Sequence, residues 1–499
     1  MPSSKTTPPL RGTPPQEGNA HPKDGAQNSP PLEGWQAQPD AQFPSAGGVA
    51  RSDGVVVPKL RFPEFREAGA WKTETLGSVA TISTEKVGDQ SCIPMSITSG
   101  VGLVSQQDKF GRIIAGSSYK NYLQLKQNDF AYNKSATKEY PEGYLALYSG
   151  EALAAVPNSI FTCFRINGTS PAPKYLDYLF HCNLHGKWLQ KFIQVGARAH
   201  GSLSINDSDL LALPVPLPEG PLSLTEQQKI ADCFASLDER ITLEAQKLDT
   251  LKTHKKGLMQ QLFPAVGETL PKLRFPEFRD AGEWDERELG PLTIKVGSGI
   301  TPTGGDKNYK TKGRPFVRSQ NVGWGELILN DVAFIDEETH QSFDSTEIKV
   351  SDVLLNITGA SIGRSAVADS RIVGGNVNQH VCIIRAQQVE LNPALLNHFL
   401  ISERGQKQID SFQAGGNRQG LNFAQIRSFV IPLPPTEHEQ RRIATCLASL
   451  DDLITAQTQK LAALKTHKKG LMQQLFPSVG GVPEGQGGSP SVGGVAGEA

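Results

Sequence analysis

A long internal repeat constrains this chain more than any other feature. The segment PKLRFPEFR occupies 58–66 and returns at 271–279, and LKTHKKGLMQQLFP occupies 251–264 and returns at 464–477. Both pairs are displaced by 213 residues, since 58 becomes 271 and 251 becomes 464. One fixed displacement across most of a chain indicates two copies of one structural unit.

Between the repeated flanks, the segments 80–215 and 293–430 have little identity, but they share a skeleton. DFAYNKS at 129–135 resembles DVLLNIT at 352–358, IFTCFR at 160–165 resembles HVCIIR at 380–385, and PLP recurs at 216–218 and 432–434. Short β-rich runs alternate with Gly and Asn turn signals. We therefore predict an α+β fold class, in which each middle is a mixed domain of short strands with helices such as 173–194 and 393–412.

The ends differ in composition from the middle. Residues 1–57 and 478–499 are rich in Pro, Gly, Ser, Ala and Gln and poor in large apolar side chains, which favours disordered tails. The predicted boundaries are 1–57 tail, 58–218 first domain, 225–264 first long helix, 271–435 second domain, 436–477 second long helix and 478–499 tail.

Each domain is followed by a predicted long helix. The patterns Thr225-x-x-Gln228 and Thr436-x-x-Glu439 are typical of capping boxes, and Pro264 and Pro477 mark the ends. Apolar residues then recur in 4-3 steps, which indicates a coiled coil, although two ordinary amphipathic core helices are the alternative. The predicted seam consists of Leu237, Ile241, Glu244, Leu248, Leu251, Lys255 and Leu258 in the first helix and Leu450, Ile454, Gln457, Leu461, Leu464, Lys468 and Leu471 in the second.

Polar seam residues suggest a register for antiparallel pairing. A charge alone in an apolar seam is costly, whereas a polar pair specifies alignment. We predict that Glu244 faces Lys468 and that Lys255 faces Gln457, because this places leucine or isoleucine opposite leucine in the other layers. The overlap from 237 to 262 would span about 38 Å at 1.5 Å per residue, close to one turn of B-DNA, roughly 34–36 Å.

These motifs resemble the specificity subunit of type I restriction-modification systems. The resemblance covers about 58–477 and rests on the PKLRFPEFR openings, the EQ-containing helix starts and above all the KKGLMQQLFP helix ends. TPTGGDKNYKTKG at 301–313, PFVRSQNVGWG at 315–325 and ITSGVGLV at 97–104 also resemble the family. The resemblance implies two target recognition domains that read the halves of a split DNA site, held by an antiparallel coil of two spacer helices with pseudo-two-fold symmetry.

Two unlike readers on one duplicated scaffold suit an asymmetric bipartite target, whereas identical readers suit a palindrome. Base edges are read by Arg on guanine and by Asn or Gln on adenine. Taken alone, each candidate is also typical of an ordinary surface group. The candidate DNA-binding residues are Lys134, Lys138, Arg198, His200, Arg318, Gln320, Asn321, Arg364, Asn376, Asn378, Gln379, His380, Asn417, Arg418 and Gln419.

The charge balance is unusual for a tight autonomous DNA binder. Segment 59–218 carries 16 basic and 13 acidic residues, and 272–435 carries 18 and 19. This favours the hypothesis that partner subunits supply much of the grip on phosphate. The resemblance implies those partners: double-stranded DNA, two modification subunits with AdoMet, and restriction subunits with ATP and Mg. Lysines on the coil that could help docking are Lys252, Lys255, Lys256, Lys465 and Lys469.

No phosphate loop, AdoMet strand-turn, Asn/Asp-Pro-Pro-aromatic motif or metal-ligand spacing stands out, so we expect a non-catalytic chain without cofactor or metal of its own. An enzyme with an unrecognised site and a protein-binding coiled-coil scaffold stay open as alternatives. The cysteines form no CxxC pair, which favours small buried apolar residues. The absence of a long apolar run or secretory signal predicts a cytoplasmic protein.

Overall fold

The structure is a computed structural model that describes residues 55–98, 100–193, 203–302, 304–413 and 420–477. Each repeat folds as an α+β domain followed by a long helix, α6 (Ser223–Leu262) or α11 (Glu437–Leu475). Most of both predicted tails lies outside the described residues. The N-terminal domain begins before Pro58, however, because Val55 and Val56 pair with the strand that contains Trp71.

The first domain contains three small sheets, ordered β1-β2-β11, β3-β10-β7-β8 and β5-β4-β9-β6 among the described residues. Its strands and α-helices are β1 (Val55–Val56), β2 (Trp71–Thr75), α1 (Leu76–Val79), β3 (Ala80–Ser83), β4 (Ile93–Thr98), β5 (Gly102–Ser105), α2 (Gln106–Phe110), β6 (Leu123–Leu125), β7 (Phe130–Asn133), β8 (Tyr144–Leu147), β9 (Ala154–Val156), β10 (Phe161–Ile166), α3 (Pro173–His181), α4 (Leu184–Leu189), α5 (Asp207–Leu211) and β11 (Pro214–Pro218).

The second domain has the corresponding sheet β13-β19-β16-β17, with β15-β14-β18 and the pair β12-β20 beside it. Its elements are β12 (Asp285–Glu288), β13 (Thr293–Ser298), β14 (Arg314–Val317), β15 (Ala333–Ile335), α7 (Glu337–Ser342), β16 (Val353–Asn356), β17 (Ser365–Val367), β18 (Asn376–Val377), β19 (Val381–Ala386), α8 (Pro393–Ile401), α9 (Glu403–Ser411), α10 (Phe423–Arg427) and β20 (Val430–Leu433).

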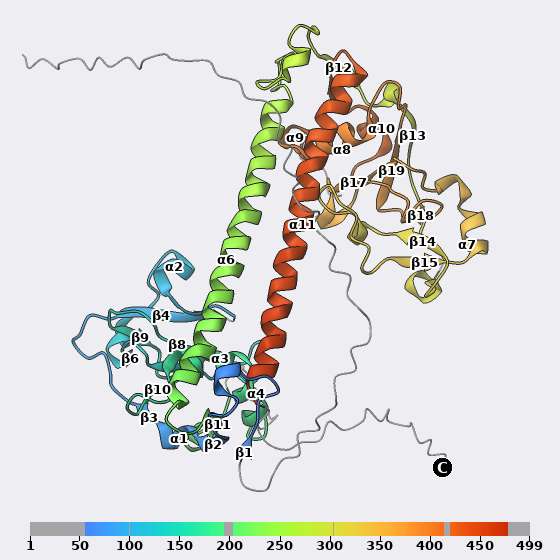
Figure 1. The fold of residues 1–499 in the computed structure, drawn as a ribbon. Helices are drawn as coiled ribbons and strands as arrows, with labels where there is room; N and C mark the ends of the chain where they lie inside the picture. The colour runs from blue at the N-terminus through green and yellow to red at the C-terminus, as the bar shows by residue number, and fades with distance from the viewer. Residues whose placement is uncertain (1–54, 99, 194–202, 303, 414–419, 478–499) are drawn as a thin grey trace, which may run out of the picture. The chain divides into compact units, whose positions relative to one another are not determined.

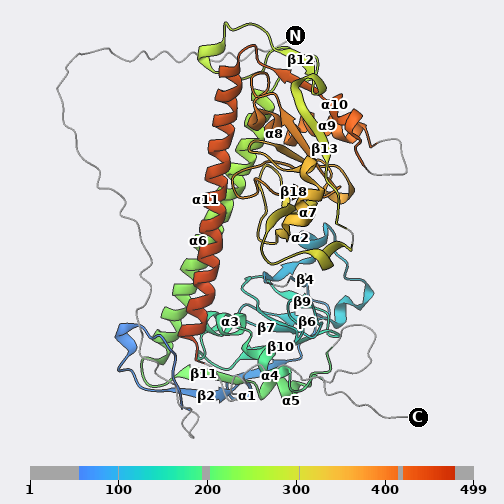
Figure 2. The ribbon, with the colours of Figure 1, turned by 90° about the vertical axis from the view of Figure 1, so that its right-hand side faces the viewer.

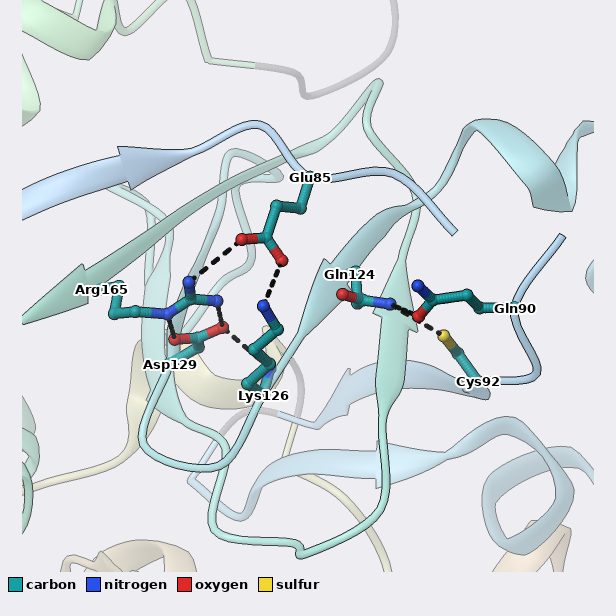
Figure 3. Close-up of polar contacts among 7 residues, drawn as sticks. All are labelled: Glu85, Gln90, Cys92, Gln124, Lys126, Asp129 and Arg165. Carbon is teal, nitrogen blue, oxygen red and sulfur yellow. Dashed lines mark hydrogen bonds and ion pairs between the residues drawn. The ribbon is translucent and has the colours of Figure 1, made fainter. Parts of the chain in front are cut away.

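The skeleton shared by the two middles forms equivalent strands. In the first domain Phe161 of β10 pairs with Asn133 of β7, and in the second Val381 of β19 pairs with Asn356 of β16. An ion pair between a fully buried aspartate and an arginine accompanies each strand pair. Arg165 Nε lies 2.6 Å from Asp129, and Arg385 Nε lies 2.7 Å from Asp352. Figure 3 shows that Glu85 also contacts Arg165 and reaches Lys126.

Two predicted helices are each broken into two. The segment 173–194 contains α3 and α4, because Asn183 adopts a left-handed conformation with φ of 56° between them. The segment 393–412 contains α8 and α9, because the Ser402 hydroxyl accepts a hydrogen bond from Gly405 N and starts a new helix. A left-handed residue in one case and a side-chain cap in the other therefore divide a segment whose apolar pattern is continuous.

The long helices pack against each other as an antiparallel pair, as Figures 1 and 2 show. Contacts between side chains fix the direction: Asp238 near the start of α6 meets Lys468 near the end of α11, and Lys255 near the end of α6 meets Asp451 near the start of α11. The predicted coiled coil is confirmed. All predicted seam residues are buried or half-buried, while most of the positions between them are exposed.

Both domain cores include residues from both helices. The first contains Ile230 and Phe234 of α6 with Met472 and Leu475 of α11, and the second contains Met259 and Leu262 of α6 with Ile443 and Leu447 of α11. Burying one such side chain contributes about 1.5–3 kcal/mol. The ends of the coil are thus part of the domain cores, and each domain binds the start of its own helix and the end of the other.

The predicted register is wrong. Glu244 lies against Gln457 rather than Lys468, with Gln457 Nε2 2.6 Å from Glu244 Oε2, and Lys255 Nζ lies 2.5 Å from Asp451 rather than facing Gln457. The prediction matched polar seam residues only with one another. A lysine side chain is long enough to leave its own layer and reach an aspartate at the flank of the seam.

The two helix starts differ from the predicted symmetry. Thr436 caps α11 as predicted, since its hydroxyl accepts a hydrogen bond from Glu439 N at 3.2 Å. Thr225 does not cap α6, which begins earlier, at Ser223, without a side-chain cap. The Ser223 hydroxyl donates instead to the carbonyl of Pro218 and ties the helix to the end of β11.

Candidate nucleic-acid interface

The EQ motif at the start of each long helix joins the helix to its domain. Glu226 is 1% exposed and accepts two hydrogen bonds from Arg61, with Nε to Oε1 at 2.7 Å and Nη2 to Oε2 at 2.6 Å. The Trp71 indole donates to the same carboxylate at 3.3 Å. The neighbouring Gln227 accepts from Ala172 N at 2.8 Å, at the start of α3.

The second repeat has the same arrangement at every position. Arg274 donates to Glu439 at 2.7 and 2.8 Å, Trp284 donates to Glu439 at 3.3 Å, and Gln440 accepts from Asn392 N at 2.8 Å. The hydrogen-bonded carboxylate raises the pKa of Arg274. Bidentate arginine–carboxylate pairs restrict orientation strongly. The repeated RFPEF and EQ motifs therefore orient both domains on the coil in the same way.

One edge of the second domain's main sheet carries a cluster of polar side chains. Ser298 at the end of β13 pairs with Cys382, and Asn356 at the end of β16 pairs with Val381 at the start of β19. Residues that follow β13 and β16 and precede β19 therefore meet at this edge. They are Thr301, Thr358, Gln379 and His380, which are linked by hydrogen bonds.

Three predicted base-reading asparagines are buried and form hydrogen bonds within the fold. Asn321 is 1% exposed, and its side chain accepts from Arg318 N and donates to Ile328 O at 2.9 Å. Asn376 is fully buried against His340 and Thr346, and Asn378, 7% exposed, caps the turn that holds His380. Asn321 and Asn376 use both ends of their amides within the fold, and Asn378 uses its Oδ1, so base contact by these three stays a prediction that their burial does not favour. Turn-forming asparagine and base-reading asparagine look alike in a sequence.

The remaining described candidates in the second domain lie nearer the surface. Arg318 is half-buried, donates to Asp331 O at 2.6 Å and stacks 5.3 Å from the Tyr309 ring. Gln320 is exposed and donates to the Asp331 carboxylate, while Arg364 is half-buried. Asn417, Arg418 and Gln419 lie outside the described residues, but Gly420, which follows them, bridges to Thr358 at the polar edge.

The equivalent edge of the first domain carries Lys134, half-buried just after β7, and Lys138 is exposed in the loop that follows. Arg198 and His200 lie outside the described residues. Leu203, which follows them, donates to Lys134 O at 2.7 Å, just as Leu421 donates to Ile357 O at 2.9 Å in the second domain. The predicted groups at 198–200 and 417–419 therefore precede equivalent anchor points.

Sequence reasoning missed Thr301 and Thr358. Thr301 lies in TPTGGDKNYKTKG, which resembles the family, and Thr358 ends DVLLNIT, part of the skeleton shared by the two middles, so a signal was present. Threonine has no distinctive base partner, and only the sheet register brings these residues beside Gln379 and His380.

A basic cleft of about 680 Å³ lies where the end of α6 meets α9. Its apolar lining includes Met259, Phe263 and Ile401. Two of the predicted docking lysines, Lys252 and Lys256, line it as exposed side chains, whereas Lys255 is buried and pairs with Asp451. The cationic side chains that line the cleft are Lys252, Lys255, Lys256, Lys272, Arg404 and Lys407.

The cysteines are all free thiols, and Cys92, Cys163 and Cys382 are buried as predicted, while the other three are half-buried. Burial raises the pKa of Cys382 to about 12. Among the described residues, His, Cys, Asp and Glu form no group that could hold a metal ion. No helix within the described ranges is both long and apolar enough to cross a bilayer.

A family model described as the type I restriction modification DNA specificity domain matches residues 70–253 and again 282–466. The chain belongs to this family. Each match spans one domain and most of the long helix that follows it, so the specificity domain is the structural unit that the sequence repeats.

Relatives and solved structures support membership of this family. The specificity subunit assigned to the type I restriction enzyme MjaX of Methanocaldococcus jannaschii is 25% identical over 336 residues, 67% of this chain and 74% of that one. The MjaVIII specificity subunit of the same organism is 22% identical and covers 60% of this chain and 69% of its own. The fold matches the S subunit of a type I system from M. genitalium with a TM-score of 0.52, 15% identity and coverage of 85% and 100%.

A second solved structure, concerned with complex assembly and conformational transition of the type I R-M system, matches with a TM-score of 0.50, 19% identity and coverage of 81% and 97%. Specificity subunits recognise DNA and are not themselves catalytic, and the catalytic activities belong to other subunits. Family membership therefore rejects both alternatives, the unrecognised enzyme and the protein-binding scaffold.

Proposed function

We propose that each domain of this specificity subunit reads one half of an asymmetric bipartite DNA site and that the coil sets the distance between the halves. The observation that carries this proposal is a common sheet edge with different side chains. Gln379 and His380 precede Val381 in the second domain, and Ser159 and Ile160 precede the equivalent Phe161 in the first. One scaffold with two different surfaces suits two different half-sites.

Exchange of one domain tests this proposal. The subunit is expressed with its modification subunit in a host, and the methylated motif is read by sequencing the genome for modified adenine. Replacing 80–215 with the corresponding segment of another family member should alter one half of the motif and leave the other half unchanged. A change in both halves, or in neither, would contradict the modular reading.

The coil is tested through its length. The 17 steps from Asp238 to Lys255 span about 26 Å at 1.5 Å per residue. Deleting seven residues from the middle of both helices removes about 10 Å, the length of about three base pairs at 3.4 Å each. The stretch of unspecified bases between the two halves of the motif should shorten by about three base pairs. A motif with an unaltered gap would show that the coil does not set the spacing.

The partners follow from the same proposal. Two modification subunits bind AdoMet and dock on the coil, where the basic cleft is the candidate contact, and restriction subunits that use ATP and Mg join them in the cytoplasm. The near balance of charge in both domains supports a grip on phosphate supplied largely by these partners. DNA binding by the isolated chain as strong and as salt-dependent as that of the complex would refute this division.

The docking surface is tested with Lys252→Glu and Lys256→Glu, which reverse charge on exposed side chains of the cleft. Copurification of the modification subunit should fall while the melting temperature is retained. Lys247→Glu, on the exposed surface of α6 and not part of the cleft lining, is the matched control. Equal loss with the control would argue against the cleft.

A further inference from the structure

The turn between β18 and β19 is held rigidly at the polar edge of the second domain. Asn378 N donates to Val317 O at 3.0 Å, and Ile357 N donates to His380 O at 3.0 Å. The Asn378 side chain accepts from His380 N at 3.1 Å. Gln379, at the centre of this turn, is therefore placed by backbone bonds to two neighbouring strands, and its side chain is exposed.

Side-chain hydrogen bonds then hold the Gln379 carboxamide between Thr301 and His380. The Thr301 hydroxyl donates to Gln379 Oε1, and Gln379 Nε2 lies 3.0 Å from His380 Nε2. An amide nitrogen only donates, so His380 Nε2 accepts and the ring proton is on Nδ1. That proton points to the Thr358 hydroxyl oxygen, 2.6 Å away. The amide with its O and N exchanged makes the same contacts with each direction reversed, because a hydroxyl donates or accepts and a neutral imidazole has two tautomers; in both arrangements one amide donor and one amide acceptor are used.

This network leaves part of the amide unused. A glutamine side chain has two N–H donors and two acceptor positions, and the contacts with Thr301 and His380 occupy one of each. One donor and one acceptor remain on an exposed group. Adenine presents the complementary pair in the major groove, an N7 acceptor beside an N6 amino donor.

We propose that Gln379 reads an adenine in the half-site bound by the second domain, with Thr301, His380 and Thr358 as the positioning residues that fix its amide. This inference rests on the proposed function and adds the base and the residue that reads it. Guanine presents two acceptors, N7 and O6, so one of them would face the Gln379 oxygen. One free donor beside one free acceptor on the same amide is therefore the source of discrimination.

This network has no counterpart among the described residues of the first domain. By strand register Ser159 and Ile160 occupy the positions of Gln379 and His380, and Ser135 occupies that of Thr358. Isoleucine cannot accept a hydrogen bond, so no amide could be fixed in the same way. Ser159→Ala is thus a matched control, since it alters the equivalent turn of the other domain.

The test uses the complete complex with its modification subunits and a randomised library of duplex DNA, from which bound molecules are recovered and sequenced. Wild type should enrich a bipartite motif with an adenine in the second half. Gln379→Ala should reduce preference for that adenine about tenfold or more and leave the other positions unchanged. Gln379→Glu, which presents only acceptors, should shift the preference toward cytosine, whose N4 amino group donates.

Positioning is tested separately with Thr301→Val and Thr358→Val. Both should weaken preference for adenine without selecting another base and without lowering affinity for duplexes that lack the site. An unchanged motif in Gln379→Ala, or loss of the second-half adenine in the control Ser159→Ala, would overturn the assignment of Gln379 and leave the proposed function standing. Failure of the wild-type complex to enrich any bipartite motif would instead overturn the proposed function and this inference with it.

Discussion

Glu244 and Gln457 are the same position of the two repeats, and they meet at the centre of the coil. Gln457 Nε2 donates to Glu244 Oε2 at 2.6 Å and to Glu244 O at 2.8 Å. Contact between equivalent positions is what a two-fold axis through this point requires. The flanking pairs obey the same axis. Lys468 is the repeat equivalent of Lys255, and Asp451 is the repeat equivalent of Asp238, so the axis converts the pair Lys255–Asp451 into the pair Lys468–Asp238.

The outer pairs of the coil should contribute to stability. Asp451→Ala leaves the ammonium of Lys255, whose side chain is 10% exposed, without its carboxylate. We expect a loss of about 1–3 kcal/mol in the free energy of unfolding, measured with urea. Asp238→Ala should behave alike, and Lys255→Met combined with Asp451→Ala should recover part of the loss. The exposed neighbour Asp452 provides the control, and an equal loss in Asp452→Ala would contradict this account.

The contacts of Glu439 with Arg274 and Trp284 at the start of α11 should contribute more to stability than the outer pairs of the coil. Glu439 is 1% exposed and holds Arg274 and Trp284, so Glu439→Ala leaves an arginine unpaired within the fold. Removing one partner of a buried ion pair costs about 3–5 kcal/mol. Thermal unfolding and tryptophan fluorescence would report it. Glu437→Ala, at an exposed site two residues earlier, should change little. A stable Glu439→Ala protein with unaltered fluorescence would refute the role given to the Glu439 contacts.

His398 should make stability fall in mild acid. Burial, with a smaller effect of Lys255, lowers its pKa to about 3 from an ordinary 6.5. Below pH 6.5 the unfolded chain gains a proton that the folded chain does not, so stability present above 6.5 is lost as the pH falls, by up to about 1.4 kcal/mol per pH unit. His398→Phe should flatten the slope between about pH 6.5 and 5. His467→Gln, at an exposed site on α11, should leave it unchanged.

Two glycines should respond in opposite ways to alanine. A Cβ on Gly299 would lie 1.6 Å from Val377 O, so Gly299→Ala must displace backbone beside the Gln379 turn and should destabilise by about 1–3 kcal/mol or more. A Cβ on Gly470 within α11 meets nothing within 4 Å. Gly470→Ala should therefore stabilise the helix by about 0.5–1 kcal/mol. Thermal melts of both variants would decide, and stabilisation by Gly299→Ala would be contrary to the geometry.

The helices and the duplicated architecture could be predicted because they depend on local and repeated patterns. A 4-3 apolar period such as that from Leu237 to Leu258 indicates a seam whatever lies opposite, and identical helix ends 213 residues apart indicate equivalent environments. The breaks at Asn183 and Ser402 could not be predicted in this way, because a left-handed residue and a local cap interrupt a helix without changing its apolar period.

The sequence by itself determined that two unlike domains share one repeated scaffold and that their long helices pair. Tertiary structure alone decided the register of those helices and which candidate side chains are available at the surface. Lys255 pairs with Asp451, which is not in the predicted seam, and Asn376 is buried where Gln379 is exposed. The physical reason is that periodicity records which face of an element is covered, whereas hydrogen-bond partners depend on residues brought together from distant parts of the chain.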